Sequence, residues 1–179
     1  MASDKMKAIY KVTDTHIYGF FDRHRYLSNF HLHPVDYEGI RYPSNENAYH
    51  AAKVLPGSTQ VFFVNRHSFL LINPPQAKSL GRRVNLRNDW LFELPPRDQR
   101  NDDQGILILQ IRDKIMYELN VIKFQDPELR KLLLETGDLY LEETNWWKDD
   151  YWGVWEGNGL NKLGRILMLI RSNIKKELL

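Results

Sequence analysis

Apolar residues recur at helical spacing in two long stretches of the second half of the chain, and this periodicity restricts the fold more than any other feature. The first stripe consists of Ile108, Ile111, Ile115, Leu119 and Ile122, and the second of Leu160, Leu163, Leu167, Ile170 and Ile174. A helix with one apolar face has to bury that face against other elements. The pattern therefore predicts a core built mainly from packed helices, the last of them covering residues 159–177.

Cap and breaker residues divide the remainder into shorter helices. Ser44 is a favourable N-cap, and Pro56-Gly57 ends the helix that it starts. Asp126-Pro127 begins another helix, which Gly137 closes. Two further helices are predicted over residues 59–69 and 76–83.

Strand-forming residues gather near the N-terminus. Residues 17–21 predict a strand, and residues 35–42 predict a hairpin that turns at Glu38-Gly39. The predicted fold class is therefore mainly α, a single compact multihelical domain with a small N-terminal β-hairpin or sheet. We expect residues 1–10 to be frayed and residues 11–179 to form the domain.

Composition excludes several classes of protein. The chain of 179 residues has no cysteine, which rules out disulfides and thiolate metal sites, and its net charge of +2 argues against a dedicated duplex-binding domain. No apolar run is long enough to cross a bilayer and no signal-peptide pattern is present, so we expect a cytoplasmic, intracellular protein with no membrane contact. His31 and His33 lack a third ligand nearby, so neither a metal nor another cofactor is expected.

Glu46 is the first candidate for chemistry. With Ser44 as the cap, it occupies the second helical position, where the helix dipole favours an ionised carboxylate. Such a group can act as nucleophile, general base or electrostatic stabiliser. His50 and Lys53 share its helix face. Acids are also common in first turns for purely structural reasons, so Glu46 alone favours the structural interpretation.

Asp149 is the second candidate, because it lies in a loop rich in tryptophan. The aromatic residues of this loop are Trp146, Trp147, Trp152 and Trp155. An acid among aromatic rings can act as a proton donor, and two carboxylates in contrasting surroundings are the usual equipment for glycoside cleavage. The alternatives are a solvated turn for the acid and a packed loop or a protein-docking surface for the tryptophans.

A glycine-rich run, residues 157–164, precedes the last helix. Backbone N–H groups at such a helix start can bind an anion. Equally, Asn158 can be a helix cap and Gly164 a point of close packing, and this structural interpretation is the one that the run alone favours.

Taken in order, several short motifs resemble those of the NADAR family, from about Ile17 to Arg171. The matching pieces are YLSNF at 26–30, YPSNE at 42–46 with Ala51 and Lys53, LRNDW at 86–90, KF at 123–124, DPEL at 126–129, DDYWG at 149–153 and GLNKLG at 159–164. Departures occur at Tyr42, Asn45 and Asn47, beside the glutamate.

The resemblance implies a metal-independent N-glycosidase, a hydrolase of ribose C1–N bonds, with Glu46, Asp149 and Trp90 in the catalytic positions. Family members act on ADP-ribosylated guanine or on ribosylamino-pyrimidine phosphates of riboflavin synthesis, and the expanded aromatic loop favours ADP-ribosylated guanine, with transient DNA or RNA contact. A non-catalytic ADP-ribose-binding or nucleotide-binding module is the alternative of another class. The expected substrate-binding residues are Phe21, Ser28, Asn29, Ser44, His50, Lys53, Trp152, Gly153, Gly159, Asn161 and Lys162.

The mechanism expected from these residues has three parts. Glu46 stabilises the positive charge that develops on the ribose or activates water, and Asp149 protonates the departing nitrogen or holds the ribose hydroxyls. The base stacks on aromatic rings, and a phosphate lies near Gly159 and Lys162. In a variant of this scheme, Lys53 forms a Schiff base with the ring-opened ribose.

Overall fold

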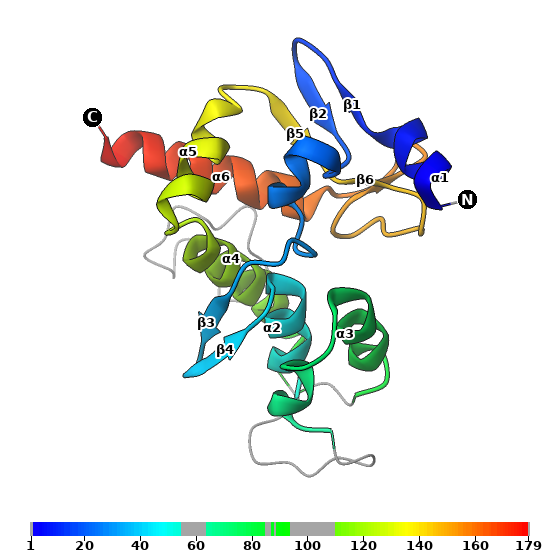
Figure 1. The fold of residues 1–179 in the computed structure, drawn as a ribbon, viewed down its shortest axis with the longest axis vertical. Helices are drawn as coiled ribbons and strands as arrows, with labels where there is room; N and C mark the ends of the chain where they lie inside the picture. Colours follow the sequence, from blue (N-terminus) through cyan, green and yellow to red (C-terminus); the bar gives the residue numbers. More distant parts are fainter. Residues whose placement is uncertain (1, 55–63, 85–86, 88, 94–109, 179) are drawn as a thin grey trace. The chain divides into compact units, whose positions relative to one another are not determined.

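The computed structural model describes residues 2–54, 64–84, 87, 89–93 and 110–178 (Figure 1). These residues form two compact units. The terminal unit combines Met1–Ser28 with Phe124–Leu179, and the central unit is Asn29–Lys123. The predicted single domain over residues 11–179 stays a prediction.

The central unit begins with a hairpin in which β3 (Val35–Tyr37) pairs with β4 (Ile40–Tyr42) in antiparallel register. Glu38 and Gly39 both have positive φ, 48° and 77°, as the tight turn between the strands requires. The predicted hairpin and its turn are confirmed.

Helix α2 (Asn45–Ala52) follows the hairpin, and all eight of its residues are buried. It packs against α3 (Pro74–Gly81), α4 (Ile111–Lys123) and strand β3 (Figure 1). The small side chains of the helix, Ala48, Ala51 and Ala52, let these neighbours approach closely. Because α2 is buried on all sides, its side chains are held in fixed positions, as a binding or catalytic site requires.

The predicted helix over residues 59–69 is wrong where the structure describes it. Residues 64–65 are not helical, and only the 3₁₀ turn η2 (Arg66–Phe69) follows, with Asn65 capping it through a capping box. Residues 59–63 lie outside the described residues, as does Ile108 of the apolar stripe. Helix α3 starts earlier than predicted, because the Asn73 side chain and Gln76 form a capping box around Pro74.

The terminal unit contains a three-stranded sheet in the order β1-β2-β5. Its strands are β1 (Lys11–Val12), β2 (His16–Tyr18) and β5 (Tyr140–Glu142), with β2 and β5 parallel. The predicted strand over 17–21 is thus shorter and starts earlier, and the sheet takes one strand from the C-terminal half of the chain.

Helices and short strands complete the terminal unit: α1 (Ala2–Ile9), η1 (Asp22–Leu27), α5 (Pro127–Glu135), β6 (Thr144–Asn145), β7 (Val154–Trp155) and α6 (Lys162–Glu177). Helix α1 occupies the segment predicted to be frayed. Helix α6 packs on β5, and at Gly164 an added Cβ would lie 2.1 Å from the Leu141 carbonyl oxygen.

The predicted mainly helical fold with a small sheet is confirmed. Within the part of the chain that the structure describes, no helix is long and apolar enough to cross a membrane.

Candidate active site

Ser44 fixes the start of α2 and, with it, the position of Glu46. Its Oγ accepts the N–H of Asn47 at 3.2 Å and donates to Oδ1 of the same residue at 2.6 Å. The Glu46 N–H donates to the backbone carbonyl of Asn29 at 3.1 Å. Glu46 therefore lies at the second helical position, as predicted, in the first turn of the helix, where the dipole favours a negative charge.

His50 holds the Glu46 carboxylate one turn along the helix. Its Nε2 lies 2.9 Å from Oε1 of Glu46, and only 4% of His50 and 6% of Glu46 are exposed. Burial lowers the pKa of His50 despite the opposing effect of Glu46, so the ring is neutral. A neutral ring that meets a carboxylate through Nε2 donates its one proton there, which is the tautomer we assign from the hydrogen-bond pattern.

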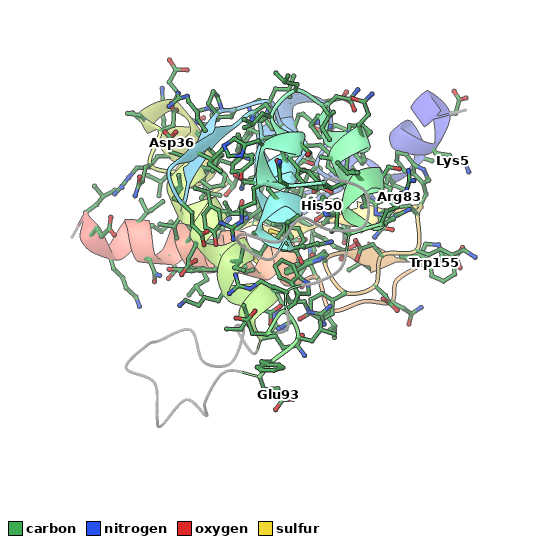
Figure 2. The ribbon with its side chains drawn as sticks, turned by 90° about the horizontal axis from the view of Figure 1, so that it is seen from below. Lys5, Asp36, His50, Arg83, Glu93 and Trp155 are labelled. Carbon is green, nitrogen blue, oxygen red and sulfur yellow. The ribbon has the colours of Figure 1, made fainter. Side chains whose placement is uncertain are left out.

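The His50 ring is also wedged against α3. A Cβ added to Gly81 would lie 2.1 Å from Nδ1 and 2.4 Å from Cγ of His50, so only glycine fits at this contact. Nδ1 is buried and has no hydrogen-bond partner among the described residues. Figure 2 labels His50 on α2 and Arg83, two residues after the end of α3; these two helices meet here. The contact leaves the ring little freedom to turn away from Glu46.

Lys53 lies beside two aromatic rings, those of Tyr49 and Trp90. Its Nζ is 5.2 Å from the Tyr49 ring centroid and 5.8 Å from that of Trp90, and the two rings are 5.1 Å apart. Burial lowers the pKa of Lys53 from 10.5 to about 8 against the opposing charge of Glu46. An amine of this kind is a usable nucleophile near neutral pH.

The central unit thus brings together four of the residues predicted from the sequence, namely Glu46, His50, Lys53 and Trp90. Trp90 is 3% exposed and reaches the group from a segment far along the chain from α2. Sequence reasoning missed Tyr49, although it stands four residues before Lys53 on the same helix, a spacing that places two side chains side by side.

Asp149 lies in the terminal unit, where it shapes a turn. Its Oδ1 accepts the N–H of Trp152 at 2.9 Å, and its own N–H donates to Oδ1 of Asn145 at 3.0 Å. The Asn145 side chain also donates to the Asp149 carbonyl at 2.7 Å. The half-buried Asp149 carboxylate is therefore part of an ordered turn, while its neighbour Asp150 is exposed. Its role as a proton donor stays a prediction.

The clustered aromatic residues of the terminal unit pack largely against one another. Phe21 stacks on Trp146 with ring centroids 5.6 Å apart, and Trp146 meets Trp147 edge-on at 5.0 Å. Trp152 meets Tyr151 edge-on at 5.0 Å. This pairing gives weight to the packed-loop interpretation, and a stacking role for Phe21 or Trp152 toward a substrate stays a prediction.

The profile of the NADAR domain matches residues 12–175 of this chain. The chain belongs to the NADAR domain family. The assignment made from the ordered motifs is confirmed.

Relatives and a solved structure agree with this assignment. An N-glycosidase of Nostoc punctiforme is 29% identical over 156 residues, which cover 85% of this chain and 86% of that protein. A riboflavin biosynthesis protein of Vibrio vulnificus is 29% identical over 159 residues, which cover 87% of this chain and 37% of that protein. The chain therefore spans little more than a third of the length of the Vibrio relative. The NMR structure of the Escherichia coli protein YbiA matches 97% of this chain and 92% of its own, with 28% identity and a TM-score of 0.68.

Two departures from the NADAR motif are explained by packing. Asn47 donates to the backbone carbonyls of Phe69 and Ile72 at 2.7 and 2.8 Å, so its amide ties α2 to the η2 segment. Asn45 donates to Oδ1 of Asn29 at 3.4 Å. The side chains of Asn29 and Ser44, both expected to bind substrate, are thus engaged in supporting α2, and their contact with substrate stays a prediction.

The glycine-rich run of this NADAR chain is closely packed. The N–H groups of residues 160–163 donate to the carbonyls of Asp150, Gly153, Tyr151 and Trp152, in that order. Since these amides already have acceptors, the start of α6 does not offer them to an anion, which supports the structural interpretation of the run. A phosphate near Gly159 and Lys162 stays a prediction. An added Cβ would lie 2.2 Å from a backbone oxygen at Gly153 and at Gly159 alike, so both glycines serve close packing.

The remaining predicted residues of the terminal unit also hold structure together. Asn161 replaces Asn158 as the residue before α6, and its side chain bonds the Glu143 N–H and the Leu141 carbonyl. Lys162 is 4% exposed, with Nζ 5.7 Å from the Tyr151 ring centroid. Ser28 ends η1 and is buried. Within the described ranges, no group of three histidine or acidic side chains gathers as a metal site would require.

Proposed function

We propose that this chain is an N-glycosidase that hydrolyses the bond between C1 of a ribose and a base nitrogen, and that its substrate is ADP-ribosylated guanine in nucleic acid. One observation carries the proposal: a buried carboxylate, Glu46, is held at a helix N-terminus by a histidine N–H, in a NADAR domain. Names of relatives, among them N-glycosidases, support the reaction type.

Glu46 fits the charge that the reaction develops. Breaking the C1–N bond leaves positive charge on the ribose, and a fixed carboxylate nearby stabilises it. Water then supplies the new C1–O bond and gives up one proton, while the departing base nitrogen takes one. The products are the restored base and free ADP-ribose. The His50 N–H and the α2 dipole keep the carboxylate in one orientation throughout.

Lys53 offers a covalent variant of this mechanism. Its amine attacks C1, the C1–N bond to the base breaks, and the base leaves with a proton. The ring-opened ribose then remains as a Schiff base on Nζ until water hydrolyses it and frees the amine. With a pKa of about 8, roughly one Lys53 side chain in ten is neutral at pH 7. Borohydride reduction during turnover traps such an adduct, and the absence of any adduct rules the variant out.

The function is tested by release of free ADP-ribose from an oligonucleotide that carries ADP-ribosylated guanine. Glu46→Gln keeps the shape of the side chain and its contact with His50 but removes the charge, so turnover should be abolished while the fold is retained. Glu128→Gln is the matched control, because Glu128 also follows a cap at the second position of a helix and is exposed. Near-normal activity in Glu46→Gln contradicts the assignment of Glu46.

A second candidate substrate is favoured by the name of the Vibrio relative, a riboflavin biosynthesis protein. If wild type releases no ADP-ribose, the same variants are assayed on a ribosylamino-pyrimidine phosphate. Activity there keeps the N-glycosidase and replaces its substrate. Inactivity on both substrates, with saturable binding of ADP-ribose, leaves the binding module as the function.

A further inference from the structure

Positively charged side chains surround Lys53 in the central unit. The charges that act most strongly on its ammonium are one carboxylate, Glu46, and three cations, Lys78, Arg82 and Arg112. Lys78 also acts on His50. Among these charges, cations outnumber carboxylates around Lys53.

Helix α3 and its C-cap residue, Arg82, carry two of these cations on one face. Lys78 and Arg82 are four residues apart, a spacing that places their side chains one above the other on a helix. Gly81 lies between them in sequence and touches the His50 ring, so the face is anchored beside the Glu46–His50 pair. The Nζ of Lys78 is 5.6 Å from the ring centroid of Phe30. Phe30 follows Asn29, whose backbone carbonyl accepts the Glu46 N–H.

An anion is attracted to a cluster of positive charges, and it relieves the repulsion between them when it binds. Lys78 is half-buried and Arg82 is exposed, so both can be reached from solution. Lysine and arginine together are the side chains that most often bind phosphate groups. The amides at the start of α6 already have carbonyl acceptors, so they are not an alternative phosphate site.

We propose that Lys78 and Arg82 on α3 form a phosphate-binding site beside Lys53, and that it holds the phosphate groups of the ribosyl substrate. The inference rests on the proposed function and deepens it by naming the anchor of the substrate. The same cations fit the diphosphate of an ADP-ribosyl group or the single phosphate of a ribosylamine phosphate. The two sources are distinguished by experiment.

Binding without turnover is the decisive measurement. The Glu46→Gln protein serves as host, and calorimetric titrations use ADP-ribose, inorganic pyrophosphate, inorganic phosphate and adenosine as probes. Lys78→Gln and Arg82→Gln should each weaken ADP-ribose binding about tenfold or more, because each removes a charge-assisted contact. Adenosine binding should not change. Lys131→Gln on α5, an exposed lysine of the terminal unit, controls for the lost charge.

Each outcome bears on the proposal. Tighter binding of pyrophosphate than of phosphate supports the diphosphate source, and the reverse supports the monophosphate source. If pyrophosphate or phosphate binds and both variants weaken it while ADP-ribose fails to bind, the phosphate site stands and the proposed substrate falls. Unchanged affinity in both variants overturns the site, as does failure of every anion to bind. An equal loss for adenosine also overturns it, because adenosine has no phosphate and the effect would then be structural.

Discussion

Substituting Gly81 by alanine tests whether the packing of α3 controls the orientation of the Glu46 carboxylate. The new methyl group would lie 2.1 Å from Nδ1 and 2.4 Å from Cγ of His50, distances at which one of the two groups has to move. Overpacking of this kind costs about 1–3 kcal/mol. Turning the ring away also removes its hydrogen bond to Glu46, a charged contact worth about 1.5–3 kcal/mol. Alanine recovers up to about 1 kcal/mol through its higher helix propensity.

The net expectation is a loss of about 1.5–6 kcal/mol in the free energy of unfolding. For a chain of this size, that corresponds to a decrease of roughly 3–24 °C in the melting temperature. Turnover should fall about 10- to 100-fold, because Glu46 loses the donor that orients it. Thermal unfolding by circular dichroism measures the first effect, and release of the ribosyl product measures the second.

Two further variants show where any loss comes from. Ser79→Ala, at an exposed position of the same helix, should leave both quantities unchanged. In a His50→Ala background, Gly81→Ala should cost less than in the wild type, because the contacts with Nδ1 and Cγ are gone and only the overlap with Cβ of residue 50, at 2.8 Å, remains. A Gly81→Ala protein with wild-type melting temperature and turnover refutes the reasoning, as does an equal loss in the His50→Ala background.

Three other substitutions give independent tests. Ser44→Ala removes the cap of α2 and the donor to the buried Asn47 amide oxygen, so it should destabilise the protein by about 2 kcal/mol in urea unfolding; an unchanged midpoint contradicts the cap. Lys53→Met should stop turnover by the covalent route yet raise the free energy of unfolding by about 1–3 kcal/mol at pH 7, because it removes a buried charge. Since the unfolded chain holds more protons than the folded one between about pH 8 and pH 10.5, wild-type stability should rise across that range and the advantage of the variant should vanish. Asp149→Asn preserves an acceptor for the turn but cannot donate a carboxyl proton to the leaving base. If Asp149 is the proton donor, kcat should fall about 100-fold in this variant with an unchanged melting temperature, whereas Asp150→Asn should keep full activity. Equal activity of the two variants rejects the donor role.

Local signals in the sequence predicted the side chains on α2 correctly. Ser44 is a strong cap, and a helix that starts there necessarily places Glu46 in its first turn and His50 one turn later. The turn at Glu38-Gly39 was equally predictable, because few residues other than glycine adopt a positive φ without strain. In each case the decisive interaction lies within a few residues of the signal.

Non-local pairing could not be predicted in the same way. Strand β5 has three residues and pairs with β2 across most of the chain, too short for an alternating pattern to show. Trp90 reaches Lys53 from another segment, and no spacing rule links the two positions. The sequence placed the start of α6 a few residues too early. The amides at this point donate to carbonyls of the preceding loop, and that contact depends on tertiary structure.

The energetics of Lys53 favour a chemical role over a structural one. Its ammonium lies beside the rings of Tyr49 and Trp90, and burial lowers its pKa to about 8, so we expect the folded protein to be more stable without that charge. A methionine would fill the same space and remove the cost. Natural proteins retain such destabilising groups mainly where function depends on them. Lys53→Arg separates two roles of Lys53, binding phosphate as a cation and attacking the ribose as a neutral amine. Arginine keeps the cation but provides no neutral amine. Substrate binding with no borohydride-trapped adduct and no turnover therefore identifies the amine itself as the essential group.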